Sequence, residues 1–99
     1  MRRARFVSVA AREFLREVAY YEEELPGSGA RFITAVQQAT ARALAFPLSG
    51  TPAAAGTRRV LVRDFPFSII YRGDEDGILV FAVAHSARRP EYWRSRTEG

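Results

Sequence analysis

The sequence contains no cysteine and no lysine, and it has one histidine among its 99 residues. Without cysteine the chain can form neither a disulfide framework nor a thiolate metal site. One histidine does not supply a metal site, so we expect no metal ion and no cofactor. The absence of thiols fits a reducing compartment, which favours a cytoplasmic protein.

Long apolar runs are also missing. No segment approaches the roughly 18 apolar residues that a membrane span requires, and the longest candidate, Gly77 to Ala84, is better interpreted as a strand. The pair Arg2-Arg3 resembles the start of an export signal, but Arg12 and Glu13 interrupt the apolar stretch that follows it. We therefore expect a protein that does not enter a membrane.

The size of the chain predicts one domain, residues 1–99, with a core of its own, since 47% of the residues are hydrophobic and 12% aromatic. No nucleophile elbow, Walker loop, dinucleotide fingerprint or HExxH motif occurs in the sequence. These absences argue against a small hydrolase, kinase or dehydrogenase.

All fifteen basic residues are arginine, and the chain has a net charge of +4 and a pI near 10.3. This charge favours an acidic partner, either a nucleic acid or an acidic protein. Arginine can bind phosphates or carboxylates with its planar fork, but it stays protonated and serves poorly as a general base.

The first half of the sequence predicts a short strand and two helices. Residues 5–8 alternate as a strand does, and Ser8 can cap a helix that ends near Leu25. Pro26-Gly27 stops this helix, Ser28 can cap the next one, and Phe46-Pro47 ends it. The stripes expected to face the core are Phe14, Val18, Tyr21 and Leu25, then Phe32, Val36, Ala39 and Ala43; Glu13 lies outside them.

The second half predicts an antiparallel meander with strands at 59–63, 67–72 and 78–85. The sequence GDEDG is expected to form the hairpin turn between the last two strands. Alternation places Val60, Val62, Phe67, Ile69 and Tyr71 on one face, which can receive the helices. Arg59, Arg63 and Arg72 fall on the other face. The whole pattern is typical of an α+β fold with a helical hairpin packed on a small antiparallel sheet.

The segment from His85 to Arg96, HSARRPEYWRSR, combines four arginines and one glutamate with Tyr92 and Trp93. Arginine interleaved with aromatic residues suits phosphate binding and base stacking, and it suits docking to an acidic protein equally well. Alternatively, Pro90 starts a short helix whose Trp93 packs back on the sheet while the arginines are solvated. His85 is the one side chain with an ordinary pKa near neutrality.

Two features of the first helix remain open at this level. Tyr20 lies roughly opposite the apolar stripe, so it is either a partner contact or a cover over the first strand. Glu22, Glu23 and Glu24 are consecutive, so their side chains diverge around the helix, and a solvated helix end is favoured over a carboxylate site.

Three segments, YYEEELPGSGARF, RRVLVRDFPFSIIYR and VFAVAHSARRPEYWRSR, resemble the RelE/ParE toxin superfamily in order and spacing over about residues 4 to 96. The resemblance implies a helical hairpin on an antiparallel sheet. It also implies the toxin of a type II toxin–antitoxin module, which forms a hetero-oligomer with a cognate antitoxin; Tyr20 is a candidate contact for that partner.

The superfamily implies two activities. RelE-like members cut mRNA on the ribosome, and by position His85 and Tyr92 would transfer protons while Arg59, Arg63, Arg88 and Arg89 hold phosphates. That branch relies on sheet lysines, which this chain lacks.

ParE-like members instead inhibit DNA gyrase, and the tyrosine pair, the FPF strand and the RRPxYW tail favour this branch. The candidate target contacts are Arg59, Arg63, Arg88, Arg89, Tyr92, Trp93 and Arg96. The alternatives are an mRNA endonuclease and a basic binding module without toxicity.

Overall fold

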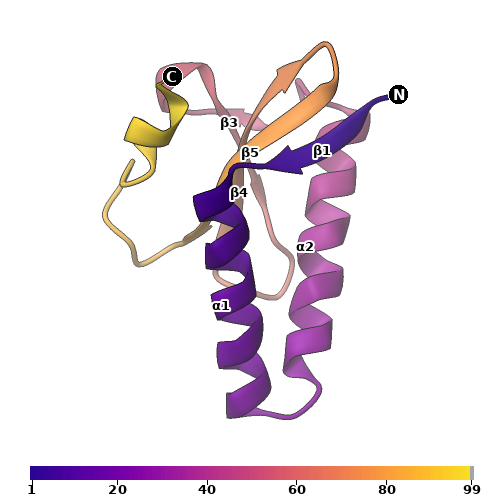
Figure 1. Ribbon diagram of the computed structural model, residues 1–99, viewed down its shortest axis with the longest axis vertical. Coiled ribbons are helices and arrows are strands. Elements are labelled where there is room, and N and C mark those ends of the chain that lie inside the picture. Colours follow the sequence, from indigo (N-terminus) through magenta and orange to yellow (C-terminus); the bar gives the residue numbers. More distant parts are fainter. Residues whose placement is uncertain (99) are drawn as a thin grey trace.

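The computed structural model describes residues 1–98, in which a strand and two helices precede the remaining strands of a sheet (Figure 1). The elements are β1 (Arg3–Phe6), α1 (Ser8–Glu24), α2 (Ser28–Ala45), β2 (Thr51–Pro52), the 3-10 turn η1 (Ala54–Gly56), β3 (Arg58–Leu61), β4 (Phe67–Asp74), β5 (Gly77–His85) and the 3-10 helix η2 (Arg94–Thr97). This order confirms the predicted α+β fold. Neither α1, α2 nor any other helix in the described residues is long and apolar enough to cross a membrane.

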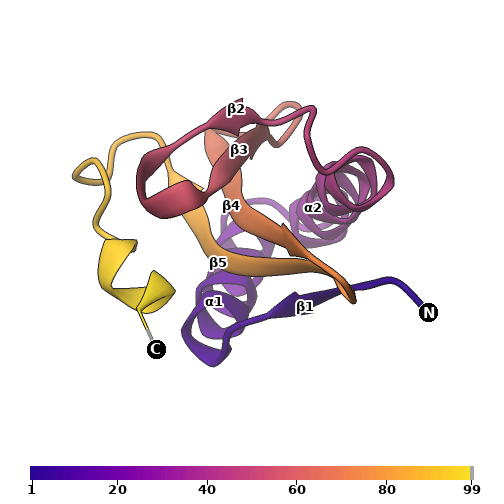
Figure 2. The same ribbon diagram turned by 90° about the horizontal axis from the view of Figure 1, so that it is seen from above.

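The sheet is mixed, with the strand order β1-β5-β4-β3-β2. The predicted antiparallel meander is present as β3, β4 and β5, and β1 adds to it by pairing parallel with β5, from Arg3 opposite Gly77 to Phe6 opposite Val80 (Figure 2). Gly77 has a φ of 129°, and a Cβ there would overlap the backbone of Arg3. A glycine is therefore required where β1 joins the sheet.

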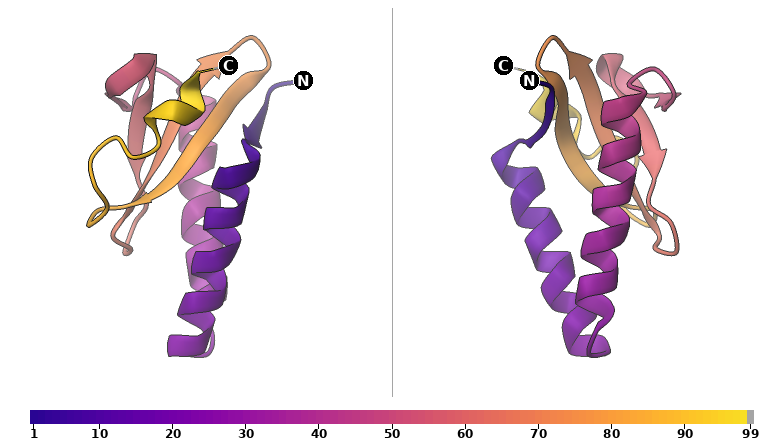
Figure 3. Two further views of the ribbon diagram at one scale, coloured as in Figure 1. Left: turned by 60° about the vertical axis from the view of Figure 1, so that its left-hand side comes forward. Right: turned by 90° about the vertical axis from the view of Figure 1, so that its right-hand side faces the viewer.

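Both helices lie on one face of the sheet, as Figure 3 shows from two sides. Phe14, Val18 and Tyr21 of α1 pack against the core as predicted, whereas Leu25 is 56% exposed because α1 ends before it and its backbone is extended. The buried core residues between helices and sheet are Phe32, Ala35, Val36, Ala39, Ala43, Val62, Phe67, Ile69, Tyr71, Ile78, Val80 and Val83. Ala39 and Ala43 let α2 approach its neighbours closely.

The serines predicted to cap the helices do not do so. Val7 is the N-cap of α1, and Gly27, with a φ of 95°, is the N-cap of α2, and neither makes a side-chain cap. The N-terminus of α2 is instead held by Glu22, whose carboxylate accepts hydrogen bonds from the backbone N–H groups of Gly27 and Gly29, both at 3.1 Å. A carboxylate is favourable there because it meets unpaired donors and the positive end of the helix dipole.

The face of the sheet opposite the helices carries a second, smaller core. Ile70 and Ala82 are buried there against Trp93. Trp93 therefore packs back on the sheet, which confirms one of the two predictions for the tail. The short helix of that prediction was expected to start at Pro90, whereas the helix in that segment of the described chain is η2, which starts at Arg94. We expected arginines to cover this face, but its centre is apolar and buried under Trp93.

Candidate functional site

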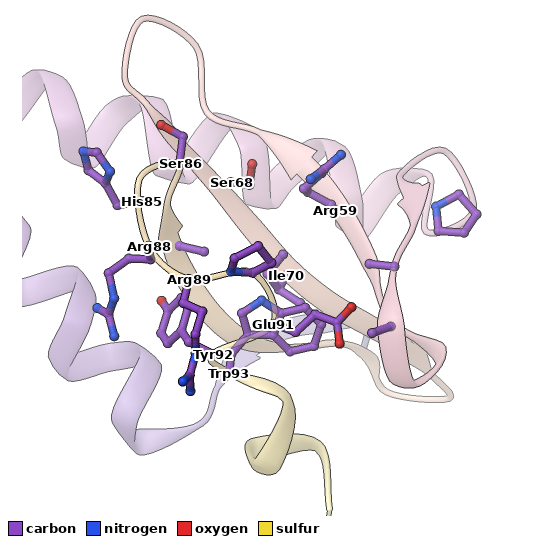
Figure 4. A pocket seen from close by; sticks show the side chains of 15 residues that line it. Arg59, Ser68, Ile70, His85, Ser86, Arg88, Arg89, Glu91, Tyr92 and Trp93 are labelled. Carbon is purple, nitrogen blue, oxygen red and sulfur yellow. The ribbon is translucent and has the colours of Figure 1, made fainter.

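The C-terminal tail, residues 86–98, folds back over the sheet and borders an open groove of about 350 Å³. Ile70, Ala84 and Trp93 are among the apolar residues that line it, and Figure 4 shows Arg59 on one side and Arg88 and Tyr92 on the other. The remaining lining residues are Pro52, Ala53, Ala54, Ser68, His85, Ser86, Arg89, Pro90 and Glu91. We call this feature the arginine groove.

Three arginines of the groove, Arg59, Arg88 and Arg89, are exposed. The salt bridges within residues 1–98 join Arg5 to Asp74, Arg94 to Glu91 and Arg96 to Glu13, so none of these three is ion-paired. The guanidinium of Arg88 lies 3.9 Å from the centre of the Tyr92 ring, which fixes its direction. The groove thus presents unpaired positive charge around an apolar floor.

A buried carboxylate beneath the tail connects it to α1. Glu13 is only 7% exposed, and its carboxylate accepts hydrogen bonds from the Tyr92 hydroxyl at 2.7 Å and from Arg96 at 2.8 and 2.9 Å. The backbone N–H of Val83 donates a further bond at 3.1 Å. A buried carboxylate is tolerated only when its oxygens are satisfied in this way. We call Glu13, Val83, Tyr92 and Arg96 the Glu13 cluster.

The position of the Glu13 cluster follows from the short length of β1. Pairing of β1 with β5 ends at Val80, and the last backbone bond there is Val7 N–H to the Val80 carbonyl at 3.0 Å. Beyond that point Glu13 accepts from the N–H of Val83, and Arg96 donates to the carbonyl of Phe81 at 3.0 Å. Side chains therefore replace a neighbouring strand along this part of β5 and protect its edge.

Comparison with known proteins places this architecture in a family. Residues 5–90 match the profile of a family described as ParE toxin of type II toxin-antitoxin system, parDE. The chain belongs to the ParE toxin family. As a ParE toxin it is the toxin component of a type II module and has a cognate antitoxin as its partner.

The fold of this ParE toxin is also similar to a solved structure, that of the chromosomal ParDE TA system from P. aeruginosa. The TM-score is 0.73 at 15% sequence identity, and the alignment covers 86% of this chain and 96% of the other. At this identity the likeness concerns the fold. No curated protein sequence matches the chain.

Tyr92 of this ParE toxin is held as a hydrogen-bond donor. Burial and then the hydrogen bond to Glu13 raise the pKa of Tyr92 well above the ordinary value of about 10. The hydrogen bond to Glu13 likewise raises the pKa of Arg96. Both side chains therefore keep their protons at neutral pH, and neither is poised to exchange one with a substrate.

His85 is brought to the end of the arginine groove but is engaged in local structure. Its ring packs against Phe67 with 4.9 Å between ring centres, and its Nδ1 accepts a hydrogen bond from the N–H of Ala87 at 2.9 Å. The ring is therefore occupied in the local structure that follows β5. In the part of the chain that the structure describes, no three His, Asp or Glu residues form a metal site.

Strand alternation placed three arginines on one face of the sheet, and the structure removes one of them, Arg63, from that face. Arg63 follows the end of β3 at Leu61 and lies in a turn, where it lines a different depression beside α2 with Thr34 and Gln38. Arg72 donates to the carbonyl of Ala55 at 2.9 Å and lies over the Phe81 ring. Arg59, opposite Ile70, and Arg72, two residues beyond Ile70 on β4, do share the face opposite the helices, so the predicted shared face is confirmed for these two and wrong for Arg63. Of the three sheet arginines, only Arg59 lines the arginine groove.

Two further candidates for target contact, Trp93 and Arg96, are used within the protein to attach the tail. Trp93 is 5% exposed, so it offers a partner little surface. Arg96 is half-buried and uses its guanidinium on Glu13 and Phe81. The packing of Trp93 on the sheet was one of the two predictions for the tail, whereas the position of Arg96 was not apparent from the sequence, and Glu13 was expected to lie outside the buried stripe. The one local hint is that Glu13 follows the buried Ala10 by three residues, which puts both on one side of α1.

Proposed function

We propose that this ParE toxin inhibits DNA gyrase by binding it through the arginine groove. The observation that carries the proposal is that Arg59, Arg88 and Arg89 surround an apolar floor without ion-pair partners, while Tyr92 and His85 are hydrogen-bonded within the protein. This arrangement supports binding rather than proton transfer. A gyrase target also requires the toxin to act in the cytoplasm.

The chemistry of the groove favours an acidic surface on the target. Guanidinium groups bind carboxylates with paired hydrogen bonds, and Arg59, Arg88 and Arg89 are exposed and free of ion pairs within residues 1–98. Arginine and aromatic side chains are also the residues that most often dominate protein interfaces. We therefore expect an acidic segment of the target to lie between Arg59 and the arginines of the tail.

A DNA supercoiling assay tests the proposal directly. Purified toxin is expected to inhibit gyrase at stoichiometric excess, and addition of the cognate antitoxin is expected to restore supercoiling, since the antitoxin neutralises the toxin. Full supercoiling in the presence of excess folded toxin would contradict the proposal. Cleavage of mRNA in a translation extract, slowed more than about tenfold by Tyr92→Phe, would support the RelE-like activity instead. Normal growth during expression would indicate a binding module without toxicity.

The antitoxin is expected to bind elsewhere, on the helical hairpin. A second groove of about 530 Å³ lies there, and its residues are mostly apolar: Phe6, Ala11, Phe14, Leu15, Val36, Gln37, Thr40, Ala41 and Leu44. Leu15, which lines this groove, is 64% exposed and so is open to a partner. An amphipathic helix can lay its apolar face into such a groove. Tyr20 does not line it but packs edge-on against Tyr21, and its role as an antitoxin contact stays a prediction.

Replacing Leu15 with glutamate is expected to weaken antitoxin binding at least about 30-fold, because a charge is placed in the centre of an apolar contact. Co-purification and titration calorimetry measure the loss, and gyrase inhibition should be retained because the arginine groove is untouched. Tyr20→Ala serves as the comparison on the same helix. A larger loss from Tyr20→Ala than from Leu15→Glu would move the antitoxin site to the exposed tyrosine.

A further inference from the structure

The part of the tail from residue 89 to residue 98 depends on one side chain of α1 for most of its polar attachment to the rest of the chain. Within the described residues, the hydrogen bonds that join residues 89–98 to the rest of the chain come from Tyr92 and Arg96. All of them end on Glu13 except the bond from Arg96 to the Phe81 carbonyl. The other backbone and side-chain bonds in this segment close turns within the tail itself. Removing the Glu13 carboxylate therefore leaves chiefly the packing of Trp93 and the bond from Arg96 to the Phe81 carbonyl to hold residues 89–98.

The same contacts reach the arginine groove. The Tyr92 hydroxyl is bound to Glu13, and the Tyr92 ring supports the guanidinium of Arg88. Arg89 follows directly in the chain, and the tail forms the side of the groove opposite Arg59 (Figure 4). If the tail were released from the sheet, Arg88 and Arg89 would move away and Arg59 would be the one arginine left at the groove.

We propose that Glu13 is a positioning residue that holds the tail in place and so assembles the arginine groove. Glu13 acts through Tyr92 and Arg96, since its carboxylate is buried beneath them. It is not itself a contact for the target. The role of the groove in gyrase binding rests on the proposed function, whereas the attachment of the tail does not.

The sole tryptophan of the chain, Trp93, reports on this attachment because it is buried between the tail and the sheet. Glu13→Gln keeps the size of the side chain but replaces an acceptor oxygen with a donor that faces Tyr92 or Arg96. We expect Trp93 fluorescence to shift to longer wavelength and to become accessible to a soluble quencher. We also expect at least about tenfold more toxin to be needed for half-inhibition of gyrase, the change that corresponds to loss of an ordered contact surface.

Glu23→Gln is the matched control, because it makes the same change on an exposed residue of α1. It should leave both the fluorescence and the inhibition unchanged. The cooperative thermal unfolding of each variant, followed by circular dichroism, shows whether the helices and the sheet stay folded. If Glu13→Gln does not fold, Arg96→Gln removes the same ion pair from the end of the chain.

The two measurements separate the possible outcomes. Unchanged Trp93 fluorescence and quenching in a folded Glu13→Gln or Arg96→Gln variant would overturn the proposal. A released tail with undiminished gyrase inhibition would also overturn it, because the groove would then not need to be assembled. If the unaltered toxin fails to inhibit gyrase, the proposed function falls, and the attachment of the tail by Glu13 is still decided by Trp93.

Discussion

Replacing Phe32 with alanine is expected to lower the free energy of unfolding by about 3–5 kcal/mol, the range typical of a fully buried aromatic residue. Phe32 is 0% exposed and lies where the helices meet the sheet. Its ring centre is 5.1 Å from that of Tyr21 on α1 and 5.1 Å from that of Phe67 on β4. Truncation therefore removes apolar burial and ring contacts in two directions, and it leaves a cavity that the packed layers cannot close.

Urea denaturation followed by circular dichroism measures this change by linear extrapolation. Phe46→Ala is the comparison, because Phe46 is 69% exposed and its loss should change stability by no more than about 0.5 kcal/mol. If the two variants were equally stable, the core would not be organised around Phe32.

Much of this fold could be predicted because its signals are local. The spacing of Phe32, Val36, Ala39 and Ala43 marks the buried side of α2, and Pro26-Gly27 separates the two helices. Alternation across residues 67–71 identifies the face of β4 that meets the helices. Such patterns depend on one element and its immediate neighbours, so the sequence carries them directly.

The features that could not be predicted depend on contacts between distant parts of the chain. β1 joins β5 in parallel across the whole helical hairpin, and no local pattern specifies that pairing. Glu13 meets Arg96 across 83 positions, so its burial follows from where the tail lands. Arg63 left the expected face because β3 ends at Leu61, and strand ends are poorly marked in sequence. Glu13, which holds the tail in place, was therefore the residue that the sequence marked least clearly.

The double replacement Arg59→Ala and Arg89→Ala is expected to raise the toxin concentration for half-inhibition of gyrase at least about 100-fold. These residues come from β3 and from the tail, so the variant removes charge from both parts of the structure that line the groove. Neither guanidinium is ion-paired within residues 1–98. Their loss should leave folding stability nearly unchanged, and the effect should appear as weaker binding of the target.

The control is Arg3→Ala with Arg12→Ala, which removes the same charge from exposed residues of β1 and α1 that do not line the arginine groove. Long-range attraction between a basic toxin and an acidic target falls equally in both variants, and added salt screens it in both. Direct contacts are lost only when the groove arginines are removed. A similar loss of inhibition in the two double variants would mean that overall charge, and not the arginine groove, recruits the target.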